Sequence, residues 1–137
     1  MTDTRSSSTK RIDVALWCVQ SLLAVTLVGT GVWKLSTPIA SLAAKMPWMG
    51  QVSPTFLYAT AVLDLLAGAG LLLPSLTRIA PRLTVWAALG CVALMVGAVV
   101  FHGQRGEWSS TPFNVVMAAL AAFVAWGRAR RVPIAPR

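Results

Sequence analysis

Four long apolar segments, separated by short polar or mixed stretches, run through the chain. They cover residues 14–33, 54–73, 83–101 and 109–127. Each is about 20 residues long, which is the length that an α-helix needs to cross the hydrocarbon core of a bilayer. The pattern predicts an all-α integral membrane protein, a bundle of four transmembrane helices. This membrane domain is expected over residues 14–127, between a loose polar tail at 1–13 and a basic tail at 128–137.

The expected helix ends carry residues that favour helix starts and membrane interfaces. Ser53 precedes Pro54 at the second segment. Ser110 and Thr111 precede Pro112 at the fourth. A hydroxyl group can cap the free amides of a helix start, and a proline in the first turn leaves no amide hydrogen unpaired. The six tryptophans all lie near segment ends, where indole rings meet both lipid and water.

The stretch between the first two segments, residues 36–53, is too long for a tight turn. It places Ile39, Leu42, Met46 and Trp48 at roughly helical spacing. This spacing predicts a short helix that lies in the membrane interface on the outer side. Two interpretations remain open for this helix: it is a lid over the space between the transmembrane helices, or it is a plain connector.

Composition and charge agree with a membrane location. Hydrophobic residues make up 56% of the chain and charged residues only 12%, far from the balance of a soluble domain. Of the 12 Lys and Arg residues, nine lie in the two tails and the loop between the second and third segments, and three lie on the opposite side. This excess predicts that both termini are cytoplasmic. The net charge of +8 is therefore assigned to topology and contact with the lipid bilayer, and no nucleic acid is expected as a partner.

One carboxylate, Asp64, lies in the middle of the second segment. An acidic side chain near the bilayer centre costs about 2.5–3.5 kcal/mol on insertion scales. On a helix, Asp64 shares a face with small residues such as Ala61 and Gly68, and this face is expected to point into the bundle because small residues let helices approach closely. Packing of this kind is expected at four glycines: Gly31, Gly68, Gly70 and Gly97.

Three further polar residues, Lys34, His102 and Asn114, lie near the outer ends of the expected helices. Side chains lean toward the N-terminus of their own helix, so Lys34 and His102 lean inward and Asp64 leans outward. The four residues are expected to form a buried polar site in the outer half of the bundle, with Lys34 as the counter-ion of Asp64. This site is either an ion pair that fixes helix register or a ligand or proton site.

The donors of this polar site suit the carbonyl groups of a quinone head group, and the outer half of the bundle is reachable from the lipid. The chain itself has no motif for an intrinsic cofactor. Two cysteines without a Cys-x-x-Cys spacing and a single histidine predict no metal site.

The order of motifs along the chain resembles the DoxX-like family. The motifs are GVWKL with Lys34, FLYATAVLDLLAGAGLLLP with Asp64, ALMVGAVVFH with His102, and NVVMAALAAFVAWGRAR with Asn114. The resemblance covers roughly residues 28–128 and also marks Gly68 and Pro74. The family more often has Glu at the position of Asp64, which gives this chain a shorter reach.

The resemblance implies a four-helix protein of the bacterial inner membrane. Relatives include DoxD-type subunits linked to thiosulfate oxidation with quinone as acceptor. They also include a DoxX protein associated with a superoxide dismutase and a sulfurtransferase in a membrane oxidoreductase complex.

Three functions fit these observations. The first is a quinone-interacting or redox-associated subunit of an oxidoreductase complex, with a redox or sulfur-metabolism protein as its partner. The second is a non-catalytic membrane anchor or assembly partner, in which the polar site only locks the bundle. The third is a small-solute carrier, which with four helices would need to form a homo-oligomer, and no inverted repeat in the sequence supports it.

Overall fold

The computed structural model describes residues 3–137, and helices account for most of them. In chain order the elements are α1 (Asp3–Ser36), α2 (Ile39–Lys45), the 3-10 turn η1 (Pro47–Gly50), α3 (Pro54–Thr77), α4 (Arg82–Gln104), the 3-10 turn η2 (Trp108–Ser110), α5 (Thr111–Trp126) and the short π-helix η3 (Gly127–Arg131). No strand occurs within residues 3–137, so the all-α fold predicted from the sequence is confirmed for this part of the chain.

Four helical segments of the described chain are long and apolar enough to cross a membrane. They are Ser7–Ser36, Pro54–Thr77, Arg82–Gln104 and Trp108–Arg131. Large apolar side chains on their outer faces, such as Val25, Leu66 and Trp86, are exposed. Exposed apolar surface on this scale suits lipid and not water. The predicted bundle of four membrane-spanning helices is therefore confirmed.

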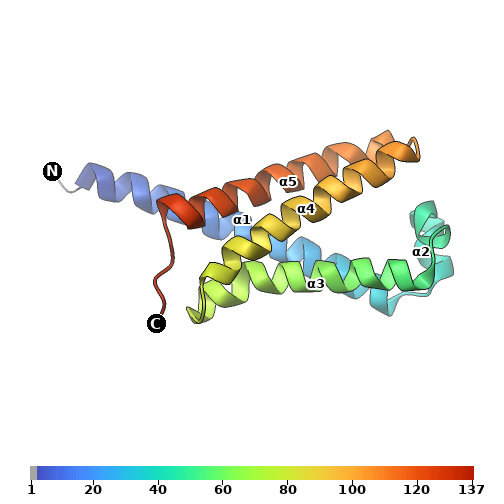
Figure 1. Ribbon diagram of the computed structural model, residues 1–137, viewed down its shortest axis with the longest axis horizontal. Helices are drawn as coiled ribbons and strands as arrows, with labels where there is room; N and C mark the ends of the chain where they lie inside the picture. The colour runs from blue at the N-terminus through green and yellow to red at the C-terminus, as the bar shows by residue number, and fades with distance from the viewer. Residues whose placement is uncertain (1–2) are drawn as a thin grey trace.

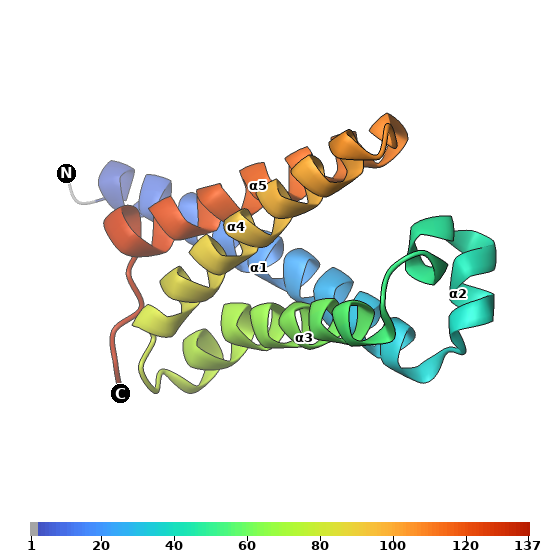
Figure 2. The ribbon, with the colours of Figure 1, turned by 45° about the vertical axis from the view of Figure 1, so that its right-hand side comes forward.

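The four long helices alternate in direction, so both termini lie at one end of the bundle and α2 lies at the other (Figure 1). Helix α1 packs along α3, and α4 packs along α5. The two pairs diverge toward the end that carries α2 (Figure 2). These ends are called the inner end and the outer end, after the predicted topology. Which end faces the cytoplasm stays a prediction, as does the position of α2 in the membrane interface.

The two predicted helix starts differ in the structure. At α3, Ser53 Oγ accepts a hydrogen bond of 3.1 Å from the Phe56 amide, and Pro54 follows at the first position, as predicted. At α5, Ser110 makes no capping hydrogen bond, and the buried Thr111 hydroxyl has no partner within residues 3–137. The reason is that the turn η2 leads straight into α5 with helical backbone angles, so the chain makes no extended step at which a side-chain cap forms.

The tails require a correction to the sequence-based expectation. Residues 3–13 are helical, because α1 already begins at Asp3 and continues without a break into the first span. Residues 1 and 2 of the predicted tail lie outside the described residues. Residues 132–137 have no regular structure, but they are held against the turn that follows α3. There Arg78 Nε donates a hydrogen bond of 2.9 Å to the carbonyl oxygen of Ala135. Both ends of the chain therefore contribute contacts at the inner end of the bundle.

Two glycines bring α1 and α3 into close contact. A Cβ atom placed on Gly31 would lie 2.8 Å from the carbonyl oxygen of Ala61 on α3. A Cβ atom placed on Gly68 would lie 2.7 Å from Val28 Cγ2 on α1. Neither position has room for a side chain, so the two backbones approach each other only because these residues are glycines.

The other two glycines expected to serve helix packing behave differently from each other. A Cβ atom on Gly70 would lie 2.7 Å from Ala87 Cβ, so Gly70 lets α3 and α4 meet. Gly97 is a correction, because a Cβ atom there would meet no atom within 4 Å. The physical reason is that Gly97 faces an open cavity.

Candidate functional site

Lys34 and Asp64 form an ion pair between α1 and α3. Lys34 Nζ donates a hydrogen bond to Asp64 Oδ2 at 2.7 Å, and both side chains are less than one-tenth exposed. The ammonium group also donates to Thr60 Oγ1 at 3.2 Å. Each charge therefore has an opposite charge as its partner, which offsets much of the cost of placing it inside the membrane. This is the pairing that the sequence predicted.

The close contact of α1 with α3 explains how the two charged groups meet. Gly31 lies one turn before Lys34, and Gly68 lies one turn after Asp64. Residues three or four positions apart share one face of a helix, so the glycine contacts and the ion pair belong to the same helix interface. The small residues bring the backbones together, and the lysine at the end of α1 can then reach the carboxylate on α3.

A cavity of about 810 Å³ lies beside this ion pair, in the outer half of the bundle. Its wall is formed by α1, α3, α4, α5 and residues of the segment between α1 and α3. All four residues of the predicted polar site line it: Lys34, Asp64, His102 and Asn114. Pockets that hold small organic ligands commonly measure about 300–1,000 Å³. The cavity thus has a suitable size for such a ligand.

Most of the remaining cavity wall is apolar, with a few hydroxyl groups. Aromatic rings come from the outer parts of the bundle: Trp48, Phe56, Phe101 and Phe113. Hydroxyl groups come from Thr26, Thr30, Thr60, Ser109 and Ser110. An apolar wall with a few polar groups is the usual composition of a site that orients a small organic molecule.

His102 lines the cavity, but its hydrogen bond joins it to Glu107 and not to the Lys34 and Asp64 pair. His102 Nδ1 lies 2.6 Å from Glu107 Oε2. Arg105 Nε donates to the other carboxylate oxygen of Glu107 at 2.8 Å. The hydrogen bond from His102, followed by the contribution of Arg105, lowers the pKa of Glu107 below its ordinary value. The structure therefore places a second charged group at the outer rim.

Sequence reasoning missed Glu107. It is one of only four acidic residues in the chain, and it follows His102 by five positions, in the short turn between α4 and η2. The scarcity of acidic residues was the available signal, because a rare carboxylate beside a histidine and an arginine at the end of a helix is a ready partner for both.

Asn114 lies near the start of α5 and lines the cavity from the helix pair opposite Lys34. The residue is only 7% exposed. Among residues 3–137, no hydrogen bond joins its amide group to another residue. Buried amide groups normally have partners. Asn114 therefore presents an unused donor and acceptor to the cavity.

The segment between α1 and α3 connects the two helix pairs at the outer end of the cavity. Trp48 of η1 lies edge-on to Phe101 and His102 of α4, with ring centroids 5.6 and 5.8 Å away. Gln51 accepts a hydrogen bond from Arg105 at the end of α4. Trp48 also lines the cavity, so this segment borders the outer end of the cavity.

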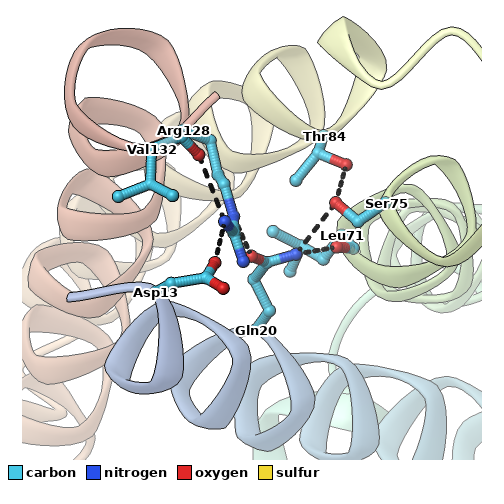
Figure 3. Close-up of polar contacts among 7 residues, drawn as sticks. All are labelled: Asp13, Gln20, Leu71, Ser75, Thr84, Arg128 and Val132. Carbon is cyan, nitrogen blue, oxygen red and sulfur yellow. Dashed lines mark hydrogen bonds and ion pairs between the residues drawn. The ribbon is translucent and has the colours of Figure 1, made fainter. Parts of the chain in front are cut away.

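A second buried polar cluster lies at the inner end, around Arg128 (Figure 3). Arg128 Nε donates to Gln20 Oε1 at 2.6 Å, and Arg128 Nη1 donates to Asp13 Oδ1 at 2.6 Å. Its guanidinium carbon lies 5.1 Å from the ring centroid of Trp17. Arg128 follows α5, and its three partners lie on α1, so the cluster fastens the last helix to the first.

Gln20 extends this cluster to α3 and α4 (Figure 3). Its Nε2 donates to the Leu71 carbonyl oxygen at 2.7 Å and to Ser75 Oγ at 3.2 Å. Ser75 and Thr84 share a hydrogen bond of 2.8 Å. The contact with α3 falls beside Pro74, which lies inside that helix and cannot supply a backbone donor. The cluster thus links all four long helices.

Sequence reasoning did not predict the inner cluster. Arg128 falls in the predicted basic tail at 128–137, and no role was predicted for Gln20 from the sequence. The available signal was a glutamine inside the first apolar segment and an arginine directly after the fourth, at ends that the topology brings together. Neither Arg128 nor Gln20 lines the cavity, so this cluster fastens helices, whereas the outer cluster borders a space that a ligand can fill.

Comparison with protein families gives one match. The model of the DoxX-like family matches residues 18–124. The matched region includes Lys34, Asp64, His102 and Asn114, and it ends before Arg128. No curated protein and no solved structure matches the chain.

Proposed function

The chain belongs to the DoxX-like family, and from that premise we propose that it binds a quinone in the cavity between its two helix pairs. In this role it is a membrane subunit that holds the quinone while a partner protein transfers electrons. We place it in the bacterial inner membrane with both termini in the cytoplasm. The cavity then lies in the outer half of the bilayer, where a lipid-soluble ligand can reach it.

The observation that carries this proposal is the amide group of Asn114. The residue is only 7% exposed, it lines the cavity, and its amide group has no hydrogen-bond partner within residues 3–137. The amide group is therefore accessible from the cavity and not sealed inside the helix packing. A carbonyl oxygen of a ligand would accept a hydrogen bond from it.

A second donor is available from Lys34. An ammonium group has three N–H donors, and Asp64 and Thr60 accept two of those of Lys34. The third has no hydrogen-bond partner within residues 3–137, and the ammonium group lies 5.8 Å from the ring centroid of Trp48, which also lines the cavity. Quinones carry carbonyl groups on different edges of one ring, and the cavity offers Lys34 on α1 and Asn114 on α5. The role of Asp64 is then to hold the lysine side chain and to keep its charge balanced.

The aromatic wall of the cavity supports a flat ligand. Trp48, Phe101 and Phe113 all line it. A flat ring can stack on such side chains or meet them edge-on, each contact adding about 0.5–1.5 kcal/mol beyond apolar burial. A saturated solute of the same volume would gain less from this wall.

The alternative is a non-catalytic membrane anchor. It is favoured by the geometry of the Lys34 and Asp64 pair, since a distance of 2.7 Å lets the two groups satisfy each other without a ligand. In this alternative the ion pair fixes the register of α1 on α3, and the cavity is filled by lipid.

The test is photolabelling with a quinone that carries a photoreactive group on its ring, using the full chain in lipid nanodiscs. Mass spectrometry then locates the label. We expect labelled peptides that contain cavity residues such as Trp48, Met95 or Met117, and competition by unlabelled quinone. We expect weaker labelling in Asn114→Leu, with Ser75→Ala as the control because Ser75 is buried but does not line the cavity. Labelling confined to lipid-facing residues, without competition, would support the anchor.

A further inference from the structure

A second, smaller cavity adjoins the first on the lipid-facing side of α3 and α4. It measures about 390 Å³, and its lining is almost entirely apolar. Leu63 and Leu66 of α3, two of its lining residues, are exposed at the outer surface of the bundle. In a membrane, a groove of this kind faces the acyl chains of the lipid. It is called the tail groove below.

The tail groove and the main cavity meet. Leu63 of α3 and two residues of α4, Ala93 and Leu94, line both of them. Helix α4 carries small residues along this line: Gly97 in the main cavity, Ala93 at the junction and Gly90 in the tail groove. A Cβ atom at Gly90 or Gly97 would meet no atom within 4 Å. The small residues therefore border open space on both sides of the junction.

The chemistry changes along this line from polar to apolar. The main cavity begins at Lys34, Asp64 and Asn114, whereas the tail groove has no charged or hydrogen-bonding side chain in its lining. A molecule that fits both parts has a polar ring at one end and a long apolar chain at the other.

We infer that the ligand of the main cavity carries a long apolar tail, which passes Ala93 and lies in the tail groove. This inference rests on the proposed function, because it takes the ring in the main cavity to be a quinone. Binding of the tail gains little free energy from the hydrophobic effect, because the tail moves into the groove from lipid and not from water. The role of the groove is instead to let the ring enter the main cavity while the tail stays in the membrane. Selection among quinones then depends on whether the tail has an exit.

The experiment measures the affinity of two probes for the chain in nanodiscs. One probe is a quinone with an isoprenoid tail, and the other has the same ring with a methyl group in place of the tail. Ala93→Phe places a ring at the junction, where the exposed position of Ala93 makes room for it without disturbing the core. Val96→Phe is the matched control, because Val96 is exposed on the same helix and lines neither cavity.

We expect the wild type and Val96→Phe to bind both probes. Ala93→Phe should bind the methyl probe unchanged and the tailed probe at least about tenfold more weakly than the wild type does, because the added ring occupies the path of the tail. If Ala93→Phe binds the tailed probe as tightly as the wild type does, the tail exit is overturned while quinone binding stays in place. If neither probe binds to the wild type, the proposed function fails and the inference fails with it. A change of oligomeric state in Ala93→Phe without any change in binding would assign the groove to contact between copies of the chain, which also overturns the inference.

Discussion

The ammonium group of Lys34 and the carboxylate of Asp64 lie 2.7 Å apart, and together they form part of the wall of an 810 Å³ cavity. The pair joins α1 to α3, and the other helix pair contributes Asn114 and His102 to the same space. The ion pair therefore fastens two helices, and it also holds a charged donor at the edge of the cavity proposed to bind a ligand.

Asp64→Leu should lower the free energy of unfolding by about 3–5 kcal/mol, because it leaves the buried ammonium of Lys34 without its partner. The double variant Lys34→Met with Asp64→Leu should recover most of this loss, since no charge remains in the interface. Equilibrium unfolding in mixed detergent and SDS measures both. A double variant as unstable as Asp64→Leu would contradict the assignment of the pair as the source of the loss.

Gly68→Ala should destabilise the bundle by about 1–3 kcal/mol, the usual range for overpacking. The added Cβ would lie 2.7 Å from Val28 Cγ2 and 3.0 Å from the Ala24 carbonyl oxygen, and the latter belongs to the backbone and cannot easily move. Gly29→Ala is the matched control on α1, because a Cβ there meets nothing within 4 Å. Thermal unfolding should show a lower midpoint for Gly68→Ala only, and equal midpoints would refute close contact at Gly68.

Arg128→Met should cost about 1–3 kcal/mol of stability, because the side-chain oxygen of Gln20 loses its donor inside the bundle. Quinone affinity should stay unchanged, since Arg128 does not line the cavity. The control is Arg130→Met, which removes the same charge from an exposed position nearby. If Arg128→Met reduced the free energy of quinone binding more than the free energy of unfolding, the assignment of separate roles to the two polar clusters would be wrong.

The outer rim should respond to acid through Glu107. Its pKa in the folded protein lies below its ordinary value of 4.5, chiefly because of the hydrogen bond from His102. A carboxyl group with a lowered pKa stabilises the fold above its unfolded pKa, and this contribution disappears as the pH falls through the folded pKa. The contribution of the Glu107 carboxylate to the stability difference between the wild type and Glu107→Gln should therefore shrink as the pH falls below about 4.5. Chemical unfolding at several pH values measures it, and a difference that grows on acidification would have the wrong sign.

The sequence was sufficient to predict the fold and the central ion pair. The length of the apolar segments determines how many helices can span a membrane, and Asp64 in the second segment required a partner that only a few residues could supply. Lys34 was the nearest cation that the topology allowed. These predictions succeeded because they depend on the large cost of an unpaired charge in lipid, which few arrangements avoid.

Other features depended on helix rotation and spacing, which the apolar pattern does not determine. Gly97 lies on the predicted inward face, yet the divergence of the helix pairs leaves open space beside it. His102 leans inward as expected, but Glu107 in the following turn offers a closer partner than Asp64. Residues 3–13 are polar and looked loose, although their continuation of α1 brings Asp13 to Arg128 across the bundle.

The most direct test is the quinone content per monomer of the protein purified gently in native lipid, determined by extraction and mass spectrometry. The comparison is between the wild type, Asn114→Leu and the control Ser75→Ala, each shown to be folded by its thermal unfolding. The account predicts bound quinone in the wild type and in Ser75→Ala, and loss of most of it in Asn114→Leu. Wild-type protein without quinone, or equal content in all three, would contradict the cavity as a quinone site and leave the protein as a membrane anchor.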